Sequence, residues 1–445
     1  MTSSGKTEKA KLTMWSLAVP IFFEQVLRSL MGTVNTFMLS RISDNASASV
    51  GVANQVINIF TMAATMLASG TAVVVNQNLG AGNDSTTRKV TANSISLGFI
   101  GGMIVGALLS AAAGLIMRGM GLEEMLVSDA VIYLRIVSLA CGLQAVSTVI
   151  SAHFRCRGKA QISMLVILLT NILNAAGSLL VLGGLFPVRN VAGIATIRLI
   201  SETIGLVILV FLMQREDWAV RAKELISFDW KLIRQFLSLG FMSGMEGISY
   251  TTIQVLTTRY ITMLPASNLS AKVYTQTINS YAWYPGNAFG QASQIIAGHM
   301  IGSGDREGAW NYVKRAWKYV VGCNAVFATL FWLFAPQIIG IFTDSAEIIA
   351  IARGLLMVDI ITCLARSLNH TFSFGLRSAG YVFWPMIIAN CSMWVFQAGL
   401  GYINTQLFGL GVIGIWIAAS VDELFRGSVV TWMWIKKKWF NSRIA

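Results

Sequence analysis

The chain has 445 residues, of which 55% are hydrophobic and only 12% are charged. Soluble domains carry about 25% charged residues, so this composition excludes a protein whose whole surface faces water. The formal net charge of +13 does not indicate nucleic-acid binding, which requires a basic patch on a folded soluble surface. The five cysteines are scattered singly and form neither a metal-binding nor a disulfide pattern.

Twelve apolar stretches are each long enough to cross a bilayer, which takes roughly 20 apolar residues in a helix. The first begins near Met14 and is too long for the apolar core of a cleaved signal peptide, so we expect it to persist as a helix. The predicted helices span 14–40, 50–78, 90–117, 129–152, 161–185, 190–213, 233–262, 270–298, 315–342, 348–375, 383–407 and 410–435. The chain is therefore predicted to be an all-α, multi-pass membrane protein.

Lysine and arginine are divided unequally between alternate connections of these helices. One set holds twenty-two: Lys6, Lys9, Lys11, Arg88, Lys89, Arg155, Arg157, Lys159, Arg215, Arg221, Lys223, Lys231, Arg234, Arg306, Lys314, Arg315, Lys318, Arg377, Lys436, Lys437, Lys438 and Arg443. The other holds five: Arg41, Arg118, Arg189, Arg259 and Lys272. Because cytoplasmic loops are enriched in basic residues, we expect both termini in the cytoplasm, and a bacterial inner membrane is the expected location.

The sequence repeats itself once, at a nearly constant offset of half its length. QVIN at 55–58 recurs as QTIN at 276–279, GAGND at 80–84 as GSGD at 302–305, and FRCR at 154–157 as FGLR at 374–377. Gly193 and Glu202 recur as Gly414 and Glu423. Six helices per half give both halves the same orientation, as in parallel transporter repeats. We therefore predict two pseudo-symmetric six-helix bundles, 1–213 and 237–445, joined by a polar linker at 214–236.

Several ionisable residues fall inside the predicted spans, where each costs at least about 2.5 kcal/mol and is a functional candidate by default. Glu246 has no basic residue within a helical turn, and Asp359 has none three or four positions away. Such acids suit a proton or sodium site, so these two and Glu24 are the predicted coupling-ion residues. Opposite charges four residues apart share one helix face, which predicts structural ion pairs between Arg198 and Glu202 and between Asp422 and Arg426.

Two such bundles leave a cleft between them in which transporters bind their substrates. The polar residues predicted to line this path are Asn35, Asn58, Asn171, Asn174, Asn279, Arg366 and His370, although amides also join helices by hydrogen bonds. The sequence contains no nucleotide-binding loop, no metal-ligand spacing and no catalytic constellation. We expect no enzyme activity and no cofactor beyond a coupling H⁺ or Na⁺. The expected partners are a small organic molecule and the lipid bilayer, not nucleic acid, and the chain is expected to be a monomer.

Several motifs, taken in order, resemble the multidrug and toxic compound extrusion (MATE) family: Pro20 with GTVNTFM at 32–38, ASGTA at 68–72 with NQNLGAG at 76–82, PGNAFG at 285–290, and LRSAG at 376–380 followed by Pro385. The resemblance implies a V-shaped fold of twelve helices that exports drugs or metabolites by alternating access, in exchange for protons or sodium.

The chain departs from that family at two acids. The first-helix Asp that many bacterial members use for coupling corresponds to Asn35, which cannot release a proton, and an acid of the tenth helix in some sodium-coupled members corresponds to Arg366. Glu246 lies near the family's seventh-helix acid. The arginines leave an anionic or zwitterionic substrate open. A lipid-linked precursor flippase of the same superfamily remains an alternative function, and a membrane-embedded enzyme or a receptor is a more distant one.

Overall fold

The computed structural model describes residues 12–184 and 190–442, which fold almost entirely into helices. The first lobe, here called the N lobe, contains α1 (Met14–Ser40), α2 (Asp44–Gly80), α3 (Asp84–Gly119), α4 (Glu124–Ser138), α5 (Cys141–Cys156), α6 (Ala160–Leu182) and α7 (Val191–Gln214). The second, the C lobe, contains α9 (Trp230–Ile261), α10 (Ala266–Gly302), α11 (Arg306–Leu333), α12 (Ala335–Ile339), α13 (Ala346–Ser378), α14 (Phe383–Ser392) and α15 (Gly411–Ile435).

Six membrane spans can be assigned to each lobe. Eight helices are individually long and apolar enough to cross a bilayer, and α4 with α5 forms a ninth span that is bent by 48°. The π-helical segments Met393–Leu400 and Ile403–Leu407 extend α14 to full length. The remaining spans, α9, α10 and α15, are as long as the others but carry polar residues that face a cavity described below. The predicted twelve-helix, two-bundle architecture is therefore confirmed.

The lobes are joined by a segment that contains only the short helix α8 (Ala222–Ile226). Helix α9 begins at Trp230, within the stretch 214–236 that the sequence suggests as the linker. Asp229 caps this helix by accepting hydrogen bonds from the backbone amides of Lys231 and Leu232, which explains an early helix start in a polar stretch.

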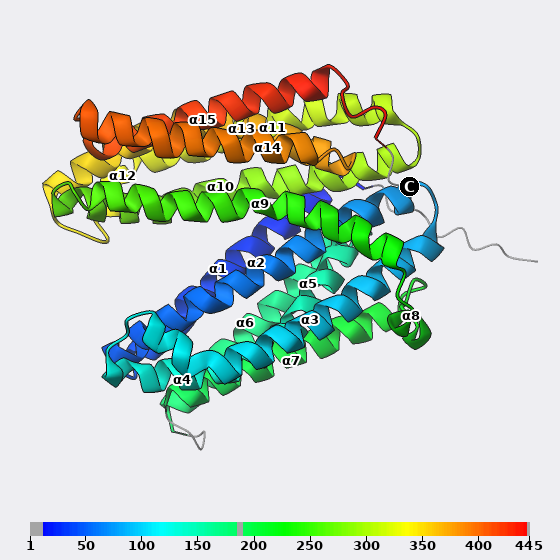
Figure 1. The fold of residues 1–445 in the computed structure, drawn as a ribbon, viewed down its shortest axis with the longest axis horizontal. Helices are drawn as coiled ribbons and strands as arrows, with labels where there is room; N and C mark the ends of the chain where they lie inside the picture. Colours follow the sequence, from blue (N-terminus) through cyan, green and yellow to red (C-terminus); the bar gives the residue numbers. More distant parts are fainter. Residues whose placement is uncertain (1–11, 185–189, 443–445) are drawn as a thin grey trace, which may run out of the picture.

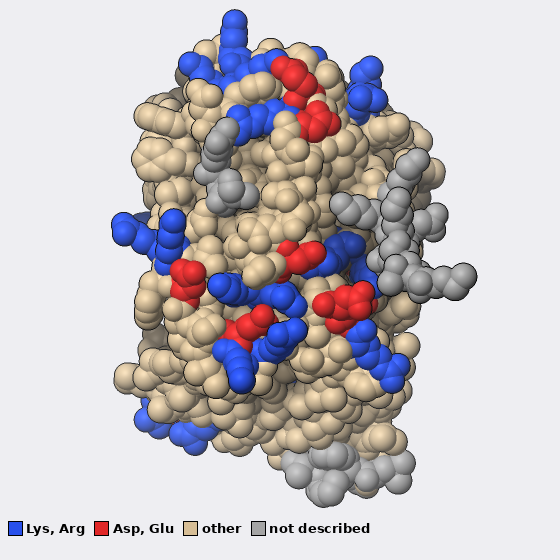
Figure 2. Space-filling view, turned by 90° about the vertical axis from the view of Figure 1, so that its right-hand side faces the viewer, with Lys and Arg blue, Asp and Glu red and all other residues tan. Residues whose placement is uncertain are grey.

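The two lobes form a V (Figure 1). They converge at the end of the molecule that carries the α2–α3, α5–α6, α10–α11 and α13–α14 turns, and they splay apart toward the end that carries α12 and the start of α4. The converging end is here called the basic face. Figure 2 shows that lysine and arginine side chains gather on it, interspersed with fewer acidic ones. The unequal division of basic residues along the sequence thus corresponds to one face of the fold.

Glycines let the lobes touch backbone to backbone near the basic face. A Cβ atom added at Gly70 of α2 would overlap the backbone of Gly240 in α9. A Cβ at Gly80 would overlap the carbonyl of His299, and one at Gly302 would overlap the carbonyl of Gln77. Small residues allow such close crossings of membrane helices. The convergence of the V therefore depends on glycines along α2, α9 and α10.

The structure sets the register of the internal repeat. Gly82 and Gly304 follow α2 and α10 with φ of 73° and 88°, and Gly158 and Gly380 follow α5 and α13 with φ of 80° and 74°. These left-handed glycines end equivalent helices, and the two pairs have the same separation along the chain, so they mark equivalent positions. FRCR at 154–157 and FGLR at 374–377 are therefore not fully equivalent segments in the structure. The four-letter match alone does not contain the glycine that ends each helix, so it could not fix the alignment of the two halves.

Candidate functional site

The C lobe contains a cavity of about 740 Å³, within the size range of sites for small molecules. Its walls come from α9, α10, α13 and α15, with Met393 from the π-helical continuation of α14, and Thr65 of α2 is the lining residue from the N lobe. The polar and aromatic side chains in the wall are Glu246, Tyr250, Gln254, Gln276, Asn279, Trp283, Tyr284, Asn287, Arg366, Asn369, His370, Arg377, Glu423 and Arg426. This cavity is the candidate substrate site.

Glu246 is held between two arginines in the cavity wall. Its Oε2 lies 2.7 Å from Nη2 of Arg377 on α13, and its Oε1 lies 2.8 Å from Nη1 of Arg426 on α15. The sequence predicts that Glu246 has no basic residue nearby. This is correct for its own helix, α9, but not for the neighbouring helices. The two partners are 131 and 180 residues away, a separation that helical spacing cannot reveal.

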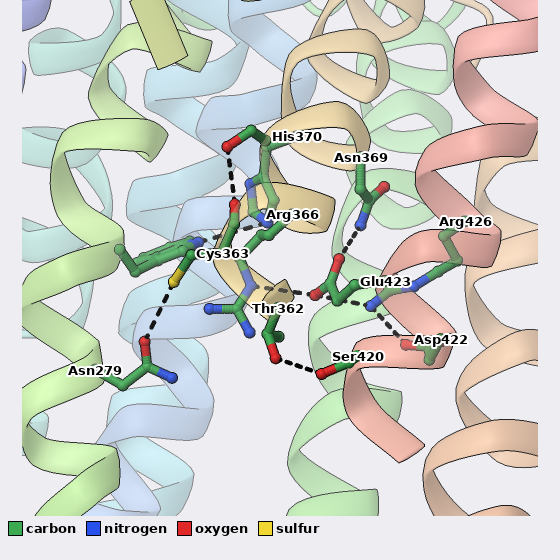
Figure 3. Close-up of polar contacts among 12 residues, drawn as sticks. Asn279, Thr362, Cys363, Arg366, Asn369, His370, Ser420, Asp422, Glu423 and Arg426 are labelled. Carbon is green, nitrogen blue, oxygen red and sulfur yellow. Dashed lines mark hydrogen bonds and ion pairs between the residues drawn. The ribbon is translucent and has the colours of Figure 1, made fainter. Parts of the chain in front are cut away.

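Arg426 links Glu246 to two further acids of α15. Its Nη2 lies 2.8 Å from Oδ2 of Asp422 and 3.1 Å from Oε1 of Glu423. The expected ion pair between Asp422 and Arg426 is thus present, as part of a larger network (Figure 3). Asp422 also accepts hydrogen bonds of 2.6 Å from Ser392 and Gln397, so the end of α14 and its π-helical continuation each supply a donor to this buried acid.

The network ends at Arg366. Glu423 accepts a hydrogen bond of 3.2 Å from Nε of Arg366 and one of 2.9 Å from Nδ2 of Asn369, both on α13 (Figure 3). His370, one turn further, accepts a hydrogen bond of 3.5 Å from the indole of Trp283 on α10. Three predicted path residues, Asn279, Arg366 and His370, therefore lie in one cavity wall.

Asp359 lies outside this network. It is buried on α13, beside Asn279 and Trp416, and its Oδ2 has no hydrogen-bond partner among the described residues. It does not belong to the cavity wall. As expected from the sequence, Asp359 has no ion pair among the described residues. It does not, however, contact the cavity directly.

Glu24 occupies the N-lobe position that corresponds to Glu246. Its Oε1 lies 2.7 Å from Arg155 of α5 and 3.1 Å from Arg28 of α1. Glu24 is related to Glu246, and Arg155 to Arg377, by the same offset that relates the helix-ending glycines. The repeat has therefore duplicated a glutamate–arginine ion pair between the first and fourth spans of each lobe.

The asparagines predicted for the N lobe have structural partners or lie at the surface. Nδ2 of Asn174 donates to Oδ1 of Asn35 over 2.5 Å, and Nδ2 of Asn171 donates to the carbonyl of Leu27 over 2.7 Å. These bonds join α1 to α6. Asn58 is exposed on α2 and, like the other three, lies outside the C-lobe cavity wall.

Arg198 and Glu202 form the expected ion pair on α7, with Nε and Oε1 3.1 Å apart. Nη1 of Arg198 also donates to Tyr133 over 2.7 Å and to Asn54 over 3.1 Å. The arginine thereby ties α7 to α4 and α2, which indicates a structural role in the N lobe.

We expect Arg198→Gln to destabilise the N lobe, because it leaves the partly buried Glu202 without its ion partner. The double variant that also carries Glu202→Gln removes the stranded charge and should cost less. The thermal midpoint of the purified protein in detergent, followed by tryptophan fluorescence, distinguishes the two. A double variant less stable than Arg198→Gln would contradict a pairing role.

Sequence reasoning missed several residues of the cavity, although a signal was present. Glu246, Tyr250 and Gln254 recur every four residues on α9 and therefore share one face. Arg366, His370 and Arg377 share a face of α13 in the same way. Polar residues at helical spacing on these apolar spans are the signal that identifies Tyr250, Gln254 and Arg377 as residues of the cavity wall.

Comparisons with known proteins agree with this fold. The MatE family model matches residues 20–180 and 243–403, once in each lobe. A curated relative, the uncharacterized transporter YisQ of Bacillus subtilis, is 33% identical over 447 residues, covering 100% of this chain and 98% of the relative.

A probable multidrug resistance protein NorM of Thermotoga maritima is 26% identical, covering 95% of this chain and 92% of its own length. A crystal structure of MATE in the bent conformation superposes with a TM-score of 0.89 at 19% identity, covering 95% of this chain and 94% of that one. Both halves of the fold thus match the same family, and the chain belongs to the MATE family of membrane transporters.

Proposed function

We propose that this protein is a proton-coupled exporter of small organic molecules that works by alternating access, with its substrate site in the C-lobe cavity. The observation that carries the proposal is the position of Glu246, whose two carboxylate oxygens face Arg377 and Arg426 in the wall of that cavity. An acid whose ion pairs join three helices can change the packing of the lobe when its charge changes.

Competition for Glu246 supplies the coupling. A positively charged group of the substrate and a proton both require the carboxylate, so binding of one opposes binding of the other. This mutual exclusion is what antiport requires, since a ligand shifts an equilibrium only by its differential affinity for the two states. Protonation also releases Arg377 and Arg426, which removes contacts between α9 and the helices α13 and α15.

A proton suits this site better than a sodium ion. A sodium ion needs several oxygen ligands, and both oxygens of Glu246 already face guanidinium groups within 2.8 Å, whereas a proton needs one oxygen. A proton neutralises the carboxylate and so weakens its attraction to both arginines. Asp359, buried with one oxygen lacking a hydrogen-bond partner among the described residues, is the second proposed proton site. Glu24, the N-lobe counterpart of Glu246, is the third.

Alternating access would use the contacts between the lobes. Helices α2, α9 and α10 meet near the basic face through glycines, and the lobes splay apart at the other end (Figure 1). By the excess of basic residues, we place the basic face and both termini in the cytoplasm of a bacterial cell. The described conformation then faces outward, ready to release substrate and accept protons.

Transport into proteoliposomes tests this proposal. With proton and sodium gradients imposed separately, vesicles with an acidic lumen should accumulate a rhodamine dye that carries a cationic group as protons leave, and a sodium gradient alone should not load them. Protein-free vesicles correct for passive partition of the dye. Loading driven by sodium, or by neither gradient, would contradict proton coupling.

A further inference from the structure

The charged network in the C lobe begins and ends with an arginine. It runs from Arg377 to Glu246, then through Arg426 to Glu423, and finally to Arg366, with successive contacts of 2.7, 2.8, 3.1 and 3.2 Å. Both terminal arginines lie on α13, eleven residues apart and therefore on the same helix face. Both also line the cavity.

Arg366 has donor capacity that the protein does not use. Only its Nε donates to Glu423, and its two terminal nitrogens make no hydrogen bond among the described residues (Figure 3). By contrast, Arg426 uses both terminal nitrogens on acids. A guanidinium edge with two free donors matches the two oxygens of a carboxylate, and Tyr250 and Gln254 in the same wall can hydrogen-bond to the same group.

The charge of the wall also limits the substrate. Three arginines and two glutamates line the cavity, and Asp422, which pairs with Arg426, balances the third arginine. A ligand with only positive charge that takes Glu246 would therefore leave Arg377 without its ion partner. A ligand that brings both charges exchanges partners instead: its cationic group takes Glu246, and its carboxylate offers an anion to an arginine. Such an exchange keeps the net charge of a low-dielectric site constant, which avoids the cost of an unpaired charge there.

We propose that the substrate is a zwitterion with an aromatic body, and that its carboxylate binds to the free edge of Arg366. The cationic group of the substrate reaches Glu246, one helical turn from Tyr250 on α9. The aromatic ring of the substrate packs against Trp283 and Tyr284 of α10. This inference rests on the proposed function for the location of the site, and it adds the chemical class of the molecule transported.

Equilibrium binding to the purified full-length protein in lipid nanodiscs tests the inference without any ion gradient. A rhodamine with a free benzoate is a zwitterion, and its methyl ester differs only by the loss of the negative charge. Fluorescence anisotropy should show about tenfold tighter binding of the acid, the difference expected for one charge-assisted contact of about 1.4 kcal/mol.

The variant Arg366→Gln should remove this preference by weakening binding of the acid about tenfold, with the ester changed less than about twofold. Arg366→Lys keeps the charge but not the bidentate edge, so its preference should be intermediate. Arg353→Gln is the matched control, because Arg353 is exposed on the same helix and absent from the cavity wall. Binding of the ester reports whether each variant is folded.

Equal binding of acid and ester to the unmodified protein would overturn the inference, and so would an equal loss of both ligands in Arg366→Gln and Arg366→Lys. Failure of the proposed function has a different signature. In that case the acid binds in an Arg366-dependent way, but a proton gradient does not move it across proteoliposomes.

Discussion

Glu246→Gln should abolish proton-driven transport, lowering the initial rate of substrate accumulation by at least about tenfold. The amide cannot exchange a proton at physiological pH, and it removes the charge that holds Arg377 and Arg426. The lobes remain free to move, so exchange of labelled for unlabelled substrate across the membrane should continue, but at a higher half-saturating substrate concentration because the cationic group loses its carboxylate. Parallel measurements of proton-driven accumulation and of exchange in proteoliposomes separate these two effects.

The control for this variant is Glu307→Gln. Glu307 lies on the basic face, is exposed and forms an ion pair with Lys437, so it tests the loss of a glutamate outside the cavity. It should leave both rates unchanged. If Glu246→Gln retained proton-driven accumulation, the coupling role of this residue would be refuted, and Asp359→Asn would be the next variant to measure.

The fold could be predicted well from the sequence because the bilayer imposes a strong constraint. Apolar stretches of the right length must be helices, and lysine and arginine are concentrated in every second connection between them. Even the repeat was visible in turn residues such as Gly80 and Gly302, which end equivalent helices. Ion pairs within one helix, such as Arg198 with Glu202, were predicted because both partners lie on one face at fixed spacing.

The candidate site could be predicted only in part, because its partners come from different helices. Glu246 was identified as an unusual acid, but Arg377 and Arg426 reach it through tertiary packing. The N-lobe amides show a second limit of sequence reasoning. Asn35 and Asn174 have the residue type of a polar path, yet their side chains are used to join α1 to α6. Composition cannot distinguish an amide that lines a cavity from one that bonds two helices.

The register of the repeat reveals a symmetric pair of hydrogen bonds between the lobes. Nε2 of Gln77 on α2 donates to the carbonyl of Ser378 at the end of α13 over 2.7 Å. Nε2 of His299 on α10 donates to the carbonyl of Cys156 at the end of α5 over 2.8 Å. In the register set by the helix-ending glycines, Gln77 corresponds to His299 and Cys156 corresponds to Ser378. We call these two bonds the latch.

The packing of Asn76 beside the latch indicates that the contact between the lobes at the basic face can open. Asn76, next to Gln77, is buried against Gly298, and neither atom of its amide has a hydrogen-bond partner among the described residues. A buried polar group without a partner costs about 1–3 kcal/mol. A rearrangement of the lobes that exposes Asn76 to water would recover this cost. The interface that the latch closes therefore includes one energetically unfavourable group, the Asn76 amide.

The double variant Gln77→Ala with His299→Ala should open the basic face. Each lost hydrogen bond contributes about 1 kcal/mol, so the equilibrium should shift by roughly thirtyfold toward the open state. Hydrogen–deuterium exchange of the protein in nanodiscs measures this as faster exchange in segments 77–84 and 299–306. Because the latch is symmetric, each single variant should produce about half of the effect in free energy.

Gln214→Ala is the matched control for the latch, since Gln214 also donates its side-chain amide to a backbone carbonyl, that of Val220, but within the N-lobe side of the chain. It should leave exchange at the basic face unchanged. Faster exchange confined to one lobe in the double variant would mean that the two bonds stabilise helix ends locally. Coordinated acceleration in both segments is the result expected if they close the cytoplasmic side of an alternating-access transporter, because only separation of the lobes exposes both at once.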